Sequence, residues 1–145
     1  MVELFSESML PLLAYLKAQG TGYCSGISFI DSTPLRVCHN RRIHSHKVFN
    51  GLAQRGQCSI GWFFGFKLHI VTHNSGQIID LLIMPGDKDD RTPLRLKNFI
   101  KKLWSKLYGD KGYIGKELFT SLFSNGILLV TTVTVAQCFK IPIKN

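Results

Sequence analysis

The sequence predicts an α/β domain in which helices flank a mixed sheet. A hairpin of two long apolar strands, an amphipathic segment after it, and a closing strand–helix–strand alternation support this fold class. A crossover helix that joins hairpin strands to a further strand makes a mixed sheet the natural arrangement. The 145 residues, 45% of them hydrophobic, suffice for one globular domain with one core.

The first element expected is a helix, followed by a short strand. Apolar residues at helical spacing predict a helix over residues 3–18 that ends near Gly20. Residues 26–31 are predicted to form a buried strand that ends in a polar turn at Asp31. Pro34 opposes a simple continuation of that strand, because proline cannot donate to a strand ladder.

A basic segment without periodicity precedes the hairpin. Residues 36–57 show neither helical nor strand spacing, and we expect them to form a loop. Residues 59–73 are predicted to form a long strand, and residues 74–76, Asn-Ser-Gly, to make the hairpin turn. Residues 77–86 then form the returning strand.

The last third of the chain is expected to alternate helices with strands. The segment GDKDDRTPL predicts a turn and a helix cap, with Asp89 or Asp90 accepting free N–H groups. Apolar residues from Leu96 to Leu107 recur at helical spacing, which predicts a helix there. A short strand into Asp110, a helix stopped by Asn-Gly, and a final strand, ILLVTTV, complete the order.

The charge distribution indicates a polyanionic partner. Eighteen Lys and Arg against nine Asp and Glu give a formal net charge of +9. The span from Ser32 to Ile79 has no acidic residue and contains six Lys or Arg and all five histidines. This is the electrostatic pattern of a nucleic-acid binder, although a charge that serves only solubility is the alternative. Within it, the side chains expected to face DNA phosphates are Arg41, Arg42, His44, His46, Lys47 and Arg55.

Lys67 and His69 form a second basic feature, on the first hairpin strand. Strand side chains alternate between faces, so these two point to the same side and can reach a DNA phosphate or a carboxylate. We therefore count Lys67 among the candidate DNA-binding residues.

Several function classes are disfavoured. The four cysteines form no C-x-x-C pair, and the spacing of Cys and His in residues 38–58 fits no familiar zinc pattern. Reduced thiols in a cytoplasmic protein are the simpler interpretation. No apolar run is long enough for a membrane helix, and Glu3 and Glu7 lie where a secretory signal needs positive charge.

Asp31 and Asp110 occur in the same context. Each closes an apolar segment and begins a turn, and in α/β sheets the ends of strands collect ligands. If their strands are neighbours, the two carboxylates lie side by side and suit magnesium or manganese, which prefer oxygen ligands. The alternative is that both aspartates only form turns. For Asp87, Asp89 and Asp90 helix capping is the favoured interpretation, with metal binding as the alternative.

Four segments together resemble a known family. SGISFIDSTPLRVCHNRRIHSHKVF, GWFFGFKLHIV, LLIMPGDKDDR and LYGDKGYIGKELF resemble, in this order, the transposases of bacterial insertion sequences, specifically the insertion-sequence 982 family. The resemblance runs from about Gly20 to Thr132. It implies a ribonuclease H-like catalytic domain that uses an Asp-Asp-Glu set with magnesium. Asp31 matches the first aspartate and Asp110 the second.

The resemblance also implies an activity. Such enzymes cut DNA at the ends of the element with water, and then join the freed 3′-hydroxyl to target DNA in a metal-assisted displacement. Asp31 and Asp110 would hold the metal, while Lys111 and the basic loop would position phosphates. The partners implied are element ends and target DNA, with full-length transposase or a second copy of the chain, and no membrane.

The chain departs from the family pattern after its last predicted strand. In the family a helix there carries the third acid, whereas no Asp or Glu follows Glu117 in this sequence. We therefore expect a helical lead-in over residues 1–20, a partial catalytic domain over residues 21–133 that lacks the C-terminal catalytic helix, and a divergent tail over residues 134–145. Weak metal binding and little transposition by the chain alone would follow.

Two alternatives to a catalytic domain stay open. One is a basic protein that acts without catalysis and occupies element ends or interferes with full-length transposase. A nucleic-acid module with no sequence specificity is the other, and it would bind DNA in a salt-sensitive way regardless of sequence.

Overall fold

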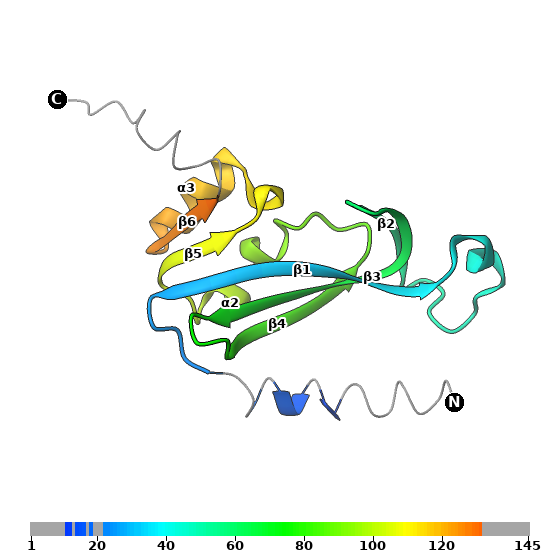
Figure 1. Cartoon of the computed structure of the whole chain (residues 1–145), viewed down its shortest axis with the longest axis horizontal. Helices are drawn as coiled ribbons and strands as arrows, with labels where there is room; N and C mark the ends of the chain where they lie inside the picture. The colour runs from blue at the N-terminus through cyan, green and yellow to red at the C-terminus, as the bar shows by residue number, and fades with distance from the viewer. Residues whose placement is uncertain (1–10, 13, 17, 19–21, 132–145) are drawn as a thin grey trace.

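The computed structural model describes residues 22–131 together with residues 11, 12, 14–16 and 18. In the described residues one mixed sheet is built from β1 (Ile27–Cys38), β2 (Gln54–Cys58), β3 (Gly61–His73), β4 (Ile78–Pro85), β5 (Ser105–Gly109) and β6 (Ile127–Thr131). Strands β2 and β4 pair with one edge of β3, and β1, β5 and β6 follow on its other side (Figure 1). The pairs of β3 are antiparallel, whereas β1, β5 and β6 run parallel.

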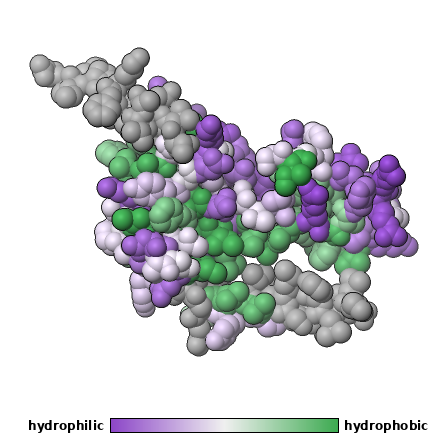
Figure 2. Space-filling view, in the orientation of Figure 1, coloured by the Kyte–Doolittle hydropathy of each residue, from purple (hydrophilic) through white to green (hydrophobic). Residues whose placement is uncertain are grey.

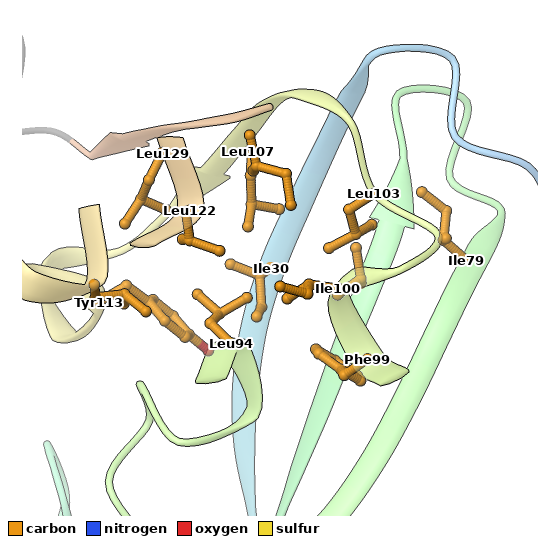
Figure 3. Close-up of a cluster of buried hydrophobic side chains, with 13 residues drawn as sticks. Ile30, Ile79, Leu94, Phe99, Ile100, Leu103, Leu107, Tyr113, Leu122 and Leu129 are labelled. Carbon is orange, nitrogen blue, oxygen red and sulfur yellow. The ribbon is translucent and has the colours of Figure 1, made fainter. Parts of the chain in front are cut away.

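Helices cover one face of this sheet. The α-helices are α2 (Lys97–Ile100) and α3 (Lys116–Ser124), and the short 3₁₀ helices are η1 (Asn40–Ser45), η2 (Pro93–Arg95) and η3 (Lys111–Tyr113). Side chains of α2, η2 and α3 share one buried cluster with strand residues, so these helices lie on the same face. Ile30 lies near the centre of that cluster, beside Leu94 and Ile100 (Figure 3). The predicted α/β, ribonuclease H-like mixed sheet with flanking helices is confirmed.

The opposite face of β1 and β5 is open among the described residues. Ser28 and Ile30 point into the core, and because strand side chains alternate, Phe29 and Asp31 point the other way. Phe29 stacks on Tyr108 of β5 with ring centroids 5.3 Å apart, and 43% of the Phe29 surface stays exposed. Asp31 therefore lies on the uncovered face of the sheet.

The predicted end of the first strand at Asp31 is wrong. Strand β1 continues to Cys38 and pairs with β3 along this length, including Pro34 opposite Lys67. The parallel pairing of β1 with β5 ends at Ile30 and Gly109, so beyond that point no described strand pairs with the other edge of β1. Proline is tolerated at a strand edge, because its missing N–H is not needed there.

The basic segment is not a plain loop. It contains the end of β1, η1 and the strand β2, which pairs with the start of β3. A Cβ atom at Gly56 of β2 would lie 2.0 Å from the Gly86 carbonyl oxygen, so glycine permits this close crossing next to the end of β4. The sequence of β2, QRGQC, is polar and lacks the alternation of apolar residues that predicts a strand.

The long helix predicted over Leu96–Leu107 is also wrong. Helix α2 has only four residues, and β5 begins at Ser105, whose φ of 65° is incompatible with a continuing helix. Leu107 lies in β5 with 1% of its surface exposed, between β1 and β6. Pairing on both sides of this strand outweighs the helical spacing of the apolar residues.

The predicted elements between residues 59 and 86 and after Asp110 are confirmed within the described residues. The hairpin of β3 and β4, the helix α3 and the strand β6 lie where they were expected, and Gly126 follows α3 with a φ of 78°. Residues 11, 12, 14–16 and 18 are helical, in line with the expected first helix, whose other residues lie outside the described ones. The end of the last predicted strand and the segment in which a C-terminal catalytic helix is predicted to be absent also fall outside them.

Candidate active site

Asp31 and Asp110 occupy neighbouring positions at the end of the parallel ladder. The last pair of β1 and β5 joins Ile30 to Gly109, and each aspartate is the next residue of its chain segment. Adjacent strands lie about 4.8 Å apart, and Asp110 is still extended, so the two carboxylates start from adjacent backbone positions. The shared context seen in the sequence thus corresponds to proximity in the fold.

Each of these carboxylates accepts a hydrogen bond from the backbone. The Ser32 N–H donates to Asp31 Oδ1 at 2.8 Å, and the Lys111 N–H donates to Asp110 Oδ1 at 2.6 Å. Asp110 is also the N-cap of η3, so the turn-forming role considered for it is real. Both aspartates are solvent-exposed. One oxygen of each is oriented by the backbone, and the carboxylate stays accessible from solvent.

Tyr113 lies against the segment that ends in Asp110. Its ring is buried, and a Cβ atom at Gly109 would come within 3.1 Å of that ring, so the glycine gives the ring its place on β5. Burial raises the pKa of Tyr113, and the charges of Asp90, Asp31 and Asp110 add to this rise, while the Ser32 hydroxyl opposes it. The Tyr113 hydroxyl nevertheless reaches no partner with hydrogen-bond geometry among the described residues.

Asp90 is the site residue that the sequence argument missed. The Ser32 hydroxyl donates to Asp90 Oδ1 at 3.1 Å, and Lys67 Nζ lies 3.1 Å from the same oxygen. Lys67 also donates to the Lys88 carbonyl at 3.0 Å. Capping had been the favoured role for this aspartate, and the dense GDKDD segment contained no signal that distinguishes it from its acidic neighbours.

Lys67 and His69 lie on the covered face, beneath the connection from β4 to η2. Lys67 is 8% exposed and bound to Asp90, so it reaches a carboxylate, the second of the two partners considered, and does not lie on the basic surface. His69 is buried, and neither of its ring nitrogens has a hydrogen-bond partner among the residues that the structure describes. Burial lowers the pKa of His69, as does Lys67, while Asp90 opposes the shift, which favours the neutral ring.

The neighbouring aspartates have local partners instead. Asp89 accepts a hydrogen bond from the Arg91 N–H at 3.0 Å and pairs with the Arg91 guanidinium. Asp89 accepts a free N–H group as expected, but it does not cap a helix. The next helix, η2, begins at Pro93, and the side chain of its N-cap residue, Thr92, makes no capping hydrogen bond. Asp87 pairs with Lys88 at the surface, 3.3 Å away.

Comparison with known proteins assigns the family. Residues 21–140 match the family described as the transposase DDE domain. The chain belongs to the DDE transposase-domain family. Among solved structures, piggyBac transposase in a synaptic complex with hairpin DNA is similar, with a TM-score of 0.47 and 13% sequence identity. The match covers 84% of this chain and 27% of that one, so the chain spans about a quarter of the piggyBac protein. No curated protein matches.

The basic residues of this DDE domain lie mostly far from the carboxylates. Arg41, Arg42, His44, Lys47 and Arg55 are exposed, and η1 lies at the far end of β1 from β5 and β6 (Figure 1). Hydrophilic residues cover this tip of the molecule (Figure 2). The seven strand steps from Asp31 to Cys38 span roughly 23 Å at about 3.3 Å each.

Two of the predicted DNA-facing residues differ from this group. His46 is half-buried, and its ring packs against Phe49 and Phe64 with centroids 6.0 and 6.4 Å away. His46 therefore packs the basic segment onto β3 through its contact with Phe64, and does not face solvent as a phosphate-binding residue would. Lys111 is exposed and directly follows Asp110, so it is the predicted phosphate-binding residue that the fold brings to the carboxylates.

The carboxylate pair of the DDE domain fits a hard divalent cation. Magnesium commonly takes one or two protein carboxylates and keeps several waters, and Asp31 and Asp110 offer such a pair at an exposed edge. As the side chains lie, no three His, Cys, Asp or Glu of the described part of the chain are close enough to hold one ion. In the same part, no helix is long and apolar enough to cross a membrane.

Proposed function

We propose that this DDE domain is the catalytic domain of a DNA transposase of the insertion-sequence 982 type. Residues 21–133 form the unit that cuts DNA at element ends and transfers the freed strand to target DNA, in the cytoplasm. The observation that supports this most is the adjacency of Asp31 and Asp110 on the open face of the sheet. The partners are element ends and target DNA, bound by the basic loop.

The roles of the residues follow from their positions. Asp31 and Asp110 would hold magnesium or manganese, which when bound activates the attacking oxygen and stabilises the leaving one. The Ser32 and Lys111 N–H groups keep one oxygen of each carboxylate in a fixed direction. The Lys111 ammonium neutralises phosphate charge beside Asp110, and the exposed arginines at the tip bind the same DNA farther along.

A site with two carboxylates is expected to work poorly on its own. No acidic residue follows Glu117 in the 145 residues. Removing one carboxylate from a three-acid site lowers both its charge and its geometric control of the ion. The 145-residue chain should therefore bind magnesium weakly and transfer strands little unless a second copy or full-length transposase supplies the third acid. Specific strand transfer by the purified chain in magnesium would overturn this point.

Manganese titration tests the assignment of the metal ligands. Mn²⁺ bound between Asp31 and Asp110 should broaden the amide NMR signals of Ser32 and Lys111, because both N–H groups donate to these carboxylates. Asp31→Asn or Asp110→Asn should weaken Mn²⁺ binding by more than about 100-fold, since even indirect partners of metal ligands are worth 10–100-fold.

Asp87→Asn is the control for this titration. Asp87 is exposed and pairs with Lys88, so its change should leave the broadening unaltered. Equal broadening of the parent, Asp31→Asn and Asp110→Asn proteins would contradict the proposal.

A non-catalytic DNA-binding protein is the second candidate. The net charge of +9 and the absence of a three-ligand group in the described residues favour it. It predicts unchanged DNA affinity when both Asp31 and Asp110 become Asn. Competition between element-end DNA and random duplex then separates a sequence-specific binder from a general nucleic-acid module, for which the two affinities are equal.

A further inference from the structure

Asp90 is bonded to one of the two segments that contain the candidate metal ligands and lies beside the other. One of its oxygens accepts a hydrogen bond from Ser32, the residue after Asp31, at 3.1 Å. Its other oxygen lies beside Gly112, two positions after Asp110, where a Cβ atom, which glycine lacks, would be 3.4 Å away. Ser32 alternates with Asp31 along β1, so this bond lies on the covered face of the sheet and Asp31 points to the open face. Asp90 thus lies between β1 and η3, behind the carboxylate pair.

The position of Asp90 is itself fixed by Lys67. The Lys67 ammonium lies 3.1 Å from Asp90 Oδ1, and only 10% of the Lys67 side chain and 29% of the Asp90 side chain are exposed. Lys67 belongs to β3 and lies opposite Pro34 of β1, so its backbone is held within the sheet. Its second bond, to the Lys88 carbonyl, ties the same ammonium to the connection after β4.

We propose that Asp90 is a positioning residue that sets the distance and direction between the Asp31 and Asp110 carboxylates. It acts through its bond to the Ser32 hydroxyl on β1 and by filling the space beside Gly112 of η3, with Lys67 as its anchor. The proposal rests on the proposed function, in which Asp31 and Asp110 hold a divalent ion. Mg²⁺ accepts only a narrow range of ligand geometry, so a shift between two ligands on separate segments reduces its affinity.

Asp89 provides the matched comparison. It is the adjacent aspartate, it also forms an ion pair, and among the described residues its side-chain hydrogen bonds go to Arg91. Its removal changes the charge of the connection by the same amount without removing a bond to β1, and Arg91 can keep its own hydrogen bond to the Ile114 carbonyl at the end of η3. A difference between the two variants therefore reports the contacts of Asp90 and not a general change in charge.

The test is the Mn²⁺ titration followed by the amide signals of Ser32 and Lys111. Asp90→Ala removes the oxygens that accept from Ser32 and Lys67 and should lower the Mn²⁺ affinity by about 10–100-fold, the range seen when an indirect partner of a metal ligand is lost. Asp89→Ala should stay within about twofold of the parent protein. An unchanged affinity in Asp90→Ala would overturn the proposal.

A second variant separates positioning from stability. Asp90→Ala removes the carboxylate that faces the Lys67 ammonium, whereas Lys67→Met combined with Asp90→Leu replaces the pair by apolar side chains, an exchange that is often neutral for stability. The double variant should melt near the parent temperature and still bind Mn²⁺ at least about tenfold more weakly. Recovery of the Mn²⁺ affinity together with the melting temperature would show a purely structural role and overturn the proposal.

Asp31→Asn and Asp110→Asn in the same titration separate the two proposals. If neither of them changes the broadening, the proposed metal site itself is wrong. If both reduce it and Asp90→Ala does not, the metal site stands and only the positioning role fails.

Discussion

The two halves of β1 are built differently. Residues 27–30 lie between β3 and β5, with Ser28 and Ile30 buried. Among the described strands, residues 31–38 pair with β3 alone, and they lead into η1, which has no buried residue. The carboxylates lie where these halves meet. Metal ligands need fixed geometry, which the packed half supplies, while phosphate contacts depend on charge and tolerate a less constrained segment. The comparison indicates that the packed half of β1 fixes the position of the metal ligands, while its other half leads to the basic residues proposed to bind DNA.

The same substitution in the two regions should have very different effects on stability. Leu107 lies in β5, the strand that leads to Asp110, and is 1% exposed, whereas Leu52 lies beyond η1 and is 62% exposed. Leu107→Ala should lower the free energy of unfolding by about 2–5 kcal/mol through lost burial and a cavity. Leu52→Ala should change it by less than about 0.5 kcal/mol. Denaturant unfolding of both variants measures this, and similar losses would contradict the proposed division.

Removing charge from the basic tip should change DNA binding and leave the fold intact. With Arg41, Arg42 and Lys47 all changed to Gln, the slope of log affinity against log salt concentration should fall by about 2.7, since each phosphate contact contributes about 0.9. The three side chains are exposed, so the melting temperature should hardly move. Fluorescence anisotropy with labelled duplex at several salt concentrations measures the slope.

Three exposed lysines elsewhere make the control for that experiment. Lys97, Lys101 and Lys106 lie on α2, after it, and on β5. Their change to Gln removes the same charge at a different place. An equal fall in slope for both triple variants would mean that the basic tip is not the DNA-binding surface.

The smallest effect is expected at Asp89. The Arg91 side chain, by its hydrogen bond and charge, lowers the pKa of Asp89 to about 2. Because the folded pKa is below the unfolded value of 3.8, the stabilisation is present above about pH 4 and is lost as the pH falls through about 2. The Asp89 side chain is 48% exposed, so solvent screening keeps the contribution below about 1 kcal/mol.

Melting temperatures of the parent and Asp89→Asn between pH 7 and pH 2 test this. The variant should be slightly less stable at neutral pH, and the difference should vanish toward pH 2. A difference that does not depend on pH would exclude the ion pair as its cause.

Local patterns predicted those elements whose stability is mainly local. The β3–β4 hairpin has a turn signal between apolar runs, and α3 has a clear apolar face with Asn-Gly at its end, so both were predictable. The continuation of β1 past Pro34 and the strand identity of Leu107 depend on pairing with distant segments. No local pattern contains that information.

The candidate site divides in the same way. Asp31 and Asp110 could be proposed because each ends an apolar segment, and the fold makes them neighbours. Asp90 could not be proposed from the sequence, because its partners lie far away along the chain, Ser32 in β1 and Lys67 in β3. A carboxylate in a turn-rich acidic run gives the same local signal whether it faces solvent or a buried ammonium.

The place of the Tyr113 ring on Gly109 has a consequence for how the site forms. The ring packs in the core directly beside the backbone from which Asp110 departs, and a side chain at position 109 would crowd both that ring and Ile30. Closure of the core around this ring therefore also fixes the backbone from which Asp110 departs. We expect the acidic pair to become ordered together with the core and to be lost with it on unfolding.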